Sequence, residues 1–174
     1  MPAKTERHHG YGALRKGRWS QHDRDYFLTI CLLRPSQGLT ATPVAAAISA
    51  ELTRLESEGL WQLRTSVIMP DQLHLLVTLK DAASLSNCVR LFKGRLAPTL
   101  RAGNLRWQPS FYDHCIRSED DLLPVFLYVF LNPYRAGLAD ANTEKWPYYF
   151  CAPDDWEWFG LLTREQMPFP EWLQ

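Results

Sequence analysis

Two pairs of polar side chains in this sequence have the residue types and the spacing to act together. Gln72 and His74 are separated by one residue in the apolar stretch QLHLLVTL. In a β-strand the two side chains point to one face, and an imidazole beside an amide oxygen can bind a divalent metal ion. Tyr128 and Asn132 lie four residues apart in an apolar stretch, so a helix would place both on one face.

The second pair suits attack on a phosphate. A tyrosine hydroxyl, with an ordinary pKa of about 10, is a weak nucleophile near neutral pH. A nearby metal ion can orient and polarise the phosphate, and an asparagine one helical turn later can reach that ion. Taken alone, each pair has a simpler interpretation: a surface histidine on a sheet, and a core tyrosine in an apolar helix.

Hydrophobic periodicity and turn signals predict the elements that must position these residues. Strands are predicted over residues 26–33, 64–69, 72–79 and around 111–116, and helices over 42–58, 84–100 and from 118 towards Asn132-Pro133. Because Pro133 disfavours helical dihedrals at Asn132, we expect the last helix to bend there. The order predicts an α+β fold, namely a ferredoxin-like four-stranded antiparallel sheet with helices on one face, plus a tyrosine-bearing C-terminal helix.

Composition limits the class of protein. The chain has 174 residues, of which 46% are hydrophobic and 22% charged, which excludes disordered, collagen-like and coiled-coil chains. No apolar run reaches the roughly 18 residues of a membrane-spanning helix, and residues 1–9 lack the apolar core of a signal peptide. We therefore expect a cytoplasmic protein with no membrane partner. The four cysteines form no C-x-x-C pair, which argues against a zinc knuckle.

A net charge of zero hides an uneven distribution. Residues 1–24 hold six basic and two acidic side chains, residues 88–117 hold six and one, and residues 140–174 hold two and seven. We expect a basic N-terminal arm (1–24), a central domain (25–140) and a Trp-rich acidic tail packed on it (141–174). Basic blocks favour a polyanion partner, although a solvated basic surface is the alternative. The predicted phosphate contacts are Arg15, Lys16, Arg18, Arg90, Lys93 and Arg95.

Four ordered blocks carry a family resemblance. They are VIMPDQLHLLVTL (67–79), WQPSFYDHCIRSEDDL (107–122), YVFLNPYRAGL (128–138) and KWPYYF (145–150). In these blocks the chain resembles the REP-associated tyrosine transposases, a branch of the single-tyrosine HUH transposases. The resemblance runs from about residue 14 to about residue 150, most of the chain.

The resemblance implies an enzyme that cuts and rejoins single-stranded DNA beside short hairpins. Carried over by position, Tyr128 is the nucleophile, which forms a 5′-phosphotyrosine link. His74, Gln72 and Asn132 are the implied ligands of a Mg²⁺ or Mn²⁺ ion. The implied partner is single-stranded DNA with hairpins, bound by a monomer or a homodimer.

Gln72 is the main departure, because the family has the first histidine of its HUH motif at this position. An amide oxygen can still serve a hard ion, so Gln72 is either a weaker working ligand or the mark of a protein that binds DNA hairpins without cutting them. Asp71 is an extra ligand or a turn residue. A ferredoxin-like RNA-binding or protein-interaction module remains a further alternative.

Overall fold

A computed structural model describes residues 20–33, 37–117, 122–140 and 145–165 of the chain. The predicted contacts Arg15, Lys16 and Arg18, and most of the predicted N-terminal arm, lie outside these residues. The three-part division of the chain therefore stays a prediction.

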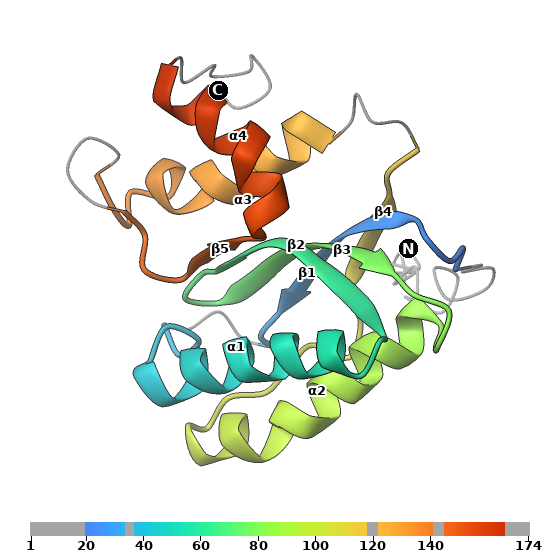
Figure 1. The fold of residues 1–174 in the computed structure, drawn as a ribbon. Helices are drawn as coiled ribbons and strands as arrows, with labels where there is room; N and C mark the ends of the chain where they lie inside the picture. The colour runs from blue at the N-terminus through green and yellow to red at the C-terminus, as the bar shows by residue number, and fades with distance from the viewer. Residues whose placement is uncertain (1–19, 34–36, 118–121, 141–144, 166–174) are drawn as a thin grey trace, which may run out of the picture.

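The strands form one antiparallel sheet, in the order β4-β1-β3-β2-β5 (Figure 1). This confirms the predicted α+β class, and the first four strands have the ferredoxin-like order. The tail adds a fifth strand beside β2, where no regular element was predicted. The bounds are β1 Asp25–Cys31, β2 Trp61–Ile68, β3 Gln72–Leu79, β4 Tyr112–Cys115 and β5 Tyr149–Cys151.

In the described part of the chain, four helices cover the two faces of the sheet. Helices α1 (Thr42–Ser57) and α2 (Leu85–Ala102) lie on one face, and α3 (Leu122–Arg135) and α4 (Pro153–Glu165) on the other (Figure 1). The start of α1 has a proline in its first turn, and the Ser84 side chain accepts a hydrogen bond from the Asn87 amide at the start of α2. Both are common helix-start signals.

The face towards α1 and α2 is an aliphatic core. Residues of β3 at every second position, Leu73, Leu75, Val77 and Leu79, are fully buried there. They pack with the matching positions of β1 and with the apolar sides of the two helices. This is the core that strand alternation predicted.

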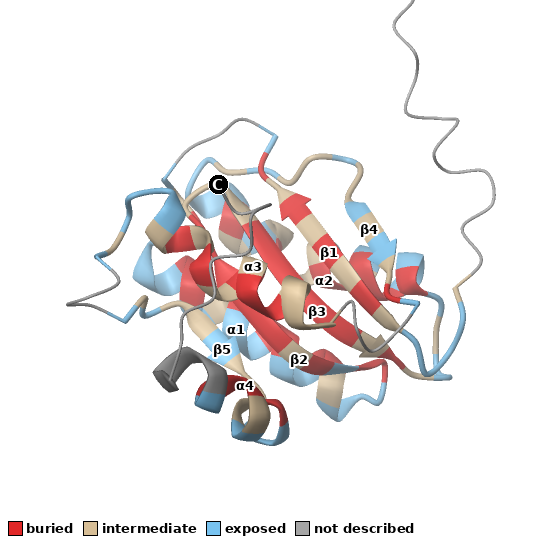
Figure 2. Ribbon diagram, turned by 90° about the horizontal axis from the view of Figure 1, so that it is seen from above, coloured by how far each residue is buried: buried red, intermediate tan, exposed pale blue. Residues whose placement is uncertain are grey.

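The opposite face is a second core, rich in aromatic rings. Leu76 of β3 packs with Phe126 of α3 and Phe159 of α4, and all three are fully buried. An ion-pair network joins α4 to the sheet, since the Arg64 guanidinium contacts both Asp25 of β1 and Asp155 of α4. Figure 2 shows buried residues running along the central strands and α3.

Helix α3 extends two residues beyond Pro133, to Arg135. The proline removes one N–H donor, but it lies in the last turn of the helix, where this loss costs little. The Ala136 amide donates to the Asn132 carbonyl, and Gly137 ends the helix with a φ of +67°. Asn132 therefore stays on the helical surface, one turn after Tyr128.

No helix within the described ranges is both long enough and apolar enough to cross a lipid bilayer.

Candidate functional site

His74 is buried between the sheet and α3 and is only 2% exposed. It faces α3 from the middle of β3, where it pairs with Thr29 of β1 and Val67 of β2. Its Nδ1 lies 2.9 Å from the Thr29 hydroxyl oxygen. Burial lowers the pKa of His74 to about 4, so the imidazole is neutral near pH 7.

The second ring nitrogen of His74, Nε2, is buried and has no hydrogen-bond partner within the described part of the chain. Leaving such an atom unpaired costs about 1–3 kcal/mol. When Nδ1–H donates to the Thr29 hydroxyl, Nε2 carries a free lone pair. A neutral imidazole held in this way is the form that binds a metal ion.

Tyr128 brings its ring to His74 from α3. The two ring centroids are 5.2 Å apart, and the rings meet nearly at right angles. Phe27 of β1 packs against both, with its ring stacked on His74 at 5.8 Å and edge-on to Tyr128 at 5.5 Å. Tyr128 is half-buried, so one side of this cluster reaches the surface.

Gln72 and Asn132 flank the pair formed by His74 and Tyr128. Gln72 lies two residues before His74 on the same face of β3 and is half-buried. Its amide oxygen accepts a weak hydrogen bond from the Cys31 thiol, at 3.8 Å. Asn132 is half-buried on α3, one turn after Tyr128. The fold thus gathers His74 and Tyr128 directly and puts one amide side chain on each element beside them.

Two residues of this site escaped sequence reasoning. Phe27 and Thr29 contact His74 from the neighbouring strand β1. Alternation along residues 25–31 gives both the same face, but nothing local to β1 indicates which residues of β3 lie opposite them.

The chain is similar in sequence to two curated proteins, although no family model matches it. It is 23% identical over 124 residues to a REP-associated tyrosine transposase of Escherichia coli (strain K12), covering 71% of this chain and 73% of that protein. It is 28% identical over 95 residues to a putative REP-associated tyrosine transposase of Haemophilus influenzae, covering 47% of this chain and 53% of that protein.

A solved structure described as a REP-associated tyrosine transposase bound to a REP hairpin matches with a TM-score of 0.66 and 24% identity. The match covers 76% of this chain and 79% of the other. At this identity it shows a shared fold. The predicted resemblance to the REP-associated tyrosine transposases is confirmed.

The donor atoms fit the divalent ion that a resemblance to the REP-associated tyrosine transposases implies. The unpaired Nε2 of a neutral, buried histidine is the observation that supports the fit. Among the described residues, no cluster of three or more His, Cys, Asp or Glu side chains could hold a metal. The donor set that the resemblance implies is one imidazole nitrogen and the amide oxygens of Gln72 and Asn132. Oxygen ligands suit Mg²⁺ and Mn²⁺, and neutral ones bind them more weakly than carboxylates do.

The predicted DNA contacts on α2 differ in their surroundings. Arg90 is exposed. Lys93 donates to the backbone carbonyls of Gln108 and Ser110, and Arg95 lies between Glu51 and Glu58. Arg90 is therefore the member of this group with the freest side chain, and the DNA-binding role of all three stays a prediction.

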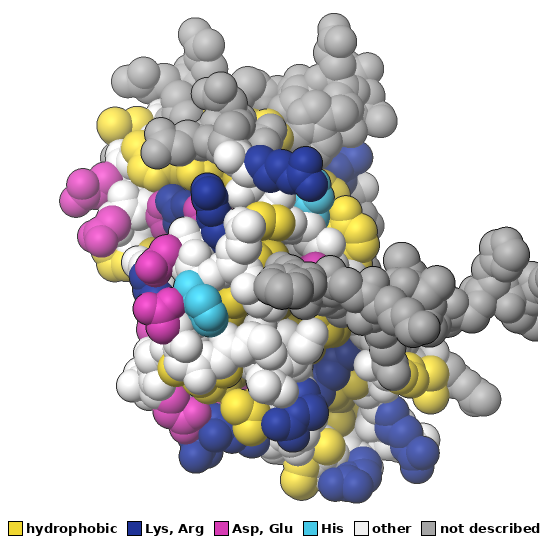
Figure 3. Space-filling model, turned by 90° about the vertical axis from the view of Figure 1, so that its right-hand side faces the viewer, with side chains coloured by type: hydrophobic (Ala, Val, Ile, Leu, Met, Phe, Trp, Pro, Cys, Tyr) yellow, Lys and Arg dark blue, Asp and Glu magenta, His cyan; other side chains and the backbone are white. Residues whose placement is uncertain are grey.

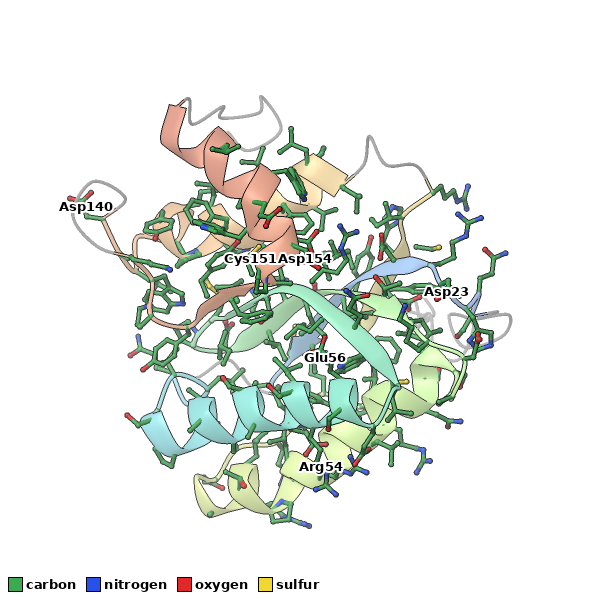
Figure 4. All side chains as sticks on the ribbon, viewed as in Figure 1. Asp23, Arg54, Glu56, Asp140, Cys151 and Asp154 are labelled. Carbon is green, nitrogen blue, oxygen red and sulfur yellow. The ribbon has the colours of Figure 1, made fainter. Side chains whose placement is uncertain are left out.

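A cavity of about 300 Å³ lies at the end of β4, away from His74 and Tyr128. Two arginines, Arg24 and Arg117, line it together with Gln21 and Tyr26. Both arginines are exposed, and neither forms an ion pair with any described residue. Figure 3 shows the right-hand side of the view in Figure 1, the side on which Asp23 is labelled in Figure 4. Lys and Arg side chains gather in the upper and lower parts of this face.

Proposed function

We propose that this protein binds hairpin-bearing DNA and acts on it as a metal-dependent single-strand endonuclease and strand transferase. The curated relatives and the solved structure with the same fold carry the name of REP-associated tyrosine transposases, and that structure is described with a REP hairpin. The observation that carries the chemical step is the neutral, buried His74, whose unpaired Nε2 lies in the ring cluster of Tyr128.

In the proposed reaction, the Tyr128 oxygen attacks a phosphorus atom of single-stranded DNA. A bond forms between that oxygen and phosphorus, and the bond from phosphorus to the 3′-oxygen breaks. The phenol proton passes to solvent, and the leaving 3′-oxygen takes a proton from solvent to become a hydroxyl. The energy of the broken bond is kept in the 5′-phosphotyrosine link, so a second 3′-hydroxyl can be joined without ATP. The roles of Tyr128, His74, Gln72 and Asn132 are all parts of this proposal.

The chain's own residues hold this arrangement in place. Thr29 fixes the ring of His74 through Nδ1, and Phe27 keeps the rings of His74 and Tyr128 at a set angle. His74, Gln72 and Asn132 would hold a Mg²⁺ or Mn²⁺ ion. When bound, such an ion polarises the scissile phosphate and stabilises the charge of the transition state.

A second candidate function rests on Gln72. The described site has one imidazole, that of His74, and the amide oxygen of Gln72 already accepts a hydrogen bond from the Cys31 thiol. A hairpin-binding protein that has lost strand cleavage would keep the fold and the basic surface with such a site.

One experiment separates the two candidates. The protein is incubated with labelled single-stranded DNA that carries a short hairpin and flanking sequence from its own genome, with Mn²⁺ or with EDTA. A denaturing gel then reveals covalent protein–DNA bands. The variants are Tyr128→Phe and Gln72→His, with Tyr134→Phe as the control because it removes a different hydroxyl from the same helix.

We expect a Mn²⁺-dependent band from the wild type and from Tyr134→Phe, and none from Tyr128→Phe. A band from Gln72→His alone would favour the impaired protein. If neither the wild type nor Gln72→His gives a band and both bind the hairpin tightly, cleavage is rejected and the non-cutting hairpin-binding protein is favoured. No hairpin binding at all would reject both.

A further inference from the structure

Tyr112 is the most exposed of the large hydrophobic side chains among the described residues, at 58%. It begins β4, which forms one edge of the sheet and is paired with β1 alone among the described strands. Figure 2 shows exposed residues on β4, in contrast with the buried strands beside it. A large aromatic ring left in water at a sheet edge has a free face for a ligand.

The exposed ring is the outer end of the cluster that holds the candidate site. Tyr112 lies across from Thr29, the partner of His74. Its ring meets that of Phe27 with centroids 6.4 Å apart and planes at 65°. Phe27 in turn contacts His74 and Tyr128. One ring, that of Phe27, therefore separates Tyr112 from the proposed nucleophile.

A strand cleaved at this site must place a nucleobase nearby. Single-stranded DNA has unstacked bases, and an aromatic side chain offers each of them a surface for stacking without regard to base identity. The nucleotides on either side of a phosphate held at Tyr128 lie next to that phosphate. Tyr112 is the exposed aromatic ring of the edge strand on the same face of the sheet as Thr29. His114, two residues later and therefore on the same face, is also exposed and adds a polar side chain that can donate a hydrogen bond.

We propose that Tyr112 is a base-stacking platform that holds a nucleotide next to the scissile phosphate. This inference rests on the proposed function, because it assigns the single-stranded DNA to the site of Tyr128. Tyr112 is a positioning residue that binds the substrate beside the reacting atoms, and it takes no part in bond making.

The test uses the same hairpin DNA with 2-aminopurine placed in turn at each nucleotide that flanks the hairpin. The fluorescence of this base falls when it stacks. All proteins carry Tyr128→Phe, so no DNA is cut during the measurement. We expect one position to be quenched on binding, with quenching kept in Tyr112→Phe and lost in Tyr112→Ala. Affinity should fall roughly 5- to 150-fold in Tyr112→Ala, as for other base–aromatic contacts.

Phe150→Ala is the matched control. Phe150 is an exposed aromatic residue, 42% exposed, on the other edge strand, and its side chain faces the α1 side of the sheet. We expect Phe150→Ala to leave quenching and affinity unchanged. With an abasic nucleotide at the quenched position, the protein with Tyr112 and the Tyr112→Ala variant should bind the DNA with equal affinity.

Unchanged quenching in Tyr112→Ala overturns the stacking proposal, and so does an equal loss in Phe150→Ala. The covalent-band experiment with Tyr128 intact keeps the two proposals apart. If the wild type forms the covalent band while 2-aminopurine is still quenched on binding to Tyr112→Ala, only the stacking proposal fails. Tyr112-dependent quenching without any covalent band rejects the cleavage step and supports a base contact in a DNA-binding protein. No binding by any variant overturns both.

Discussion

Strand β3 has two different faces. Towards α1 and α2 it presents Leu73, Leu75, Val77 and Leu79, all fully buried among aliphatic partners. Towards α3 it presents Gln72, His74 and Leu76, in surroundings of Phe27, Tyr128 and other aromatic rings. The same eight residues thus supply two cores of different chemistry.

The difference separates folding from function. The aliphatic face buries apolar side chains against one another, and this burial stabilises the fold. The aromatic face buries a neutral imidazole with an unpaired nitrogen, which lowers stability unless a ligand occupies it.

The largest contrast is expected from neighbouring residues on opposite faces. Leu75→Ala should lower the free energy of unfolding by about 2–5 kcal/mol, because it opens a cavity in the aliphatic core. The covalent band per folded molecule should stay unchanged. His74→Leu should leave the free energy of unfolding unchanged or higher, because it removes an unpaired polar atom, and should abolish the band. Urea unfolding and the gel assay measure the two effects. Equal destabilisation by both changes would show that the two faces act alike.

A smaller effect is expected from the titration of His74. Its pKa is about 4 in the folded protein, against about 6.5 unfolded, so the unfolded chain takes up a proton first as pH falls. The free energy of unfolding should therefore fall between pH 6.5 and pH 4, by roughly 3 kcal/mol, and the contribution is fully present above pH 6.5. Urea unfolding in EDTA at several pH values measures it.

His74→Leu is the control for this titration, since carboxylates also titrate in acid. The difference between the wild-type and His74→Leu stability curves should grow as pH falls from 6.5 to 4. Parallel curves would mean that His74 has an ordinary pKa and is not the buried neutral group described above.

The smallest effect concerns the Thr29 hydroxyl, which is hydrogen-bonded to Nδ1 of His74. Thr29→Val keeps the shape of the side chain and removes the hydrogen bond to Nδ1. We expect the affinity for Mn²⁺ to fall about 10- to 100-fold, as for other groups that orient a metal-bound histidine. Isothermal titration calorimetry with Mn²⁺ measures it, and Thr29→Ser should keep most of the affinity. Equal Mn²⁺ affinity in Thr29→Val would remove Thr29 from the site.

Local patterns predicted the central elements well. Strand 72–79 was predicted with the bounds it has, and the helices after it and before it were placed to within a few residues. These segments have strong periods and clear end signals. The tail has neither, so β5 and α4 were not predicted. Phe159 is buried because Phe126 of α3 lies against it, which no pattern within residues 153–165 indicates.

Which residues share a face follows from the sequence alone. Gln72 and His74 do so because a strand repeats every two residues, and Tyr128 and Asn132 because a helix repeats every 3.6. The tertiary structure alone decided the register between β1 and β3, so that Thr29 contacts His74, and the packing of α3 on the strand, so that Tyr128 meets its ring. Periodicity follows from local backbone geometry, whereas register and layer packing follow from the burial of surfaces far apart in the chain.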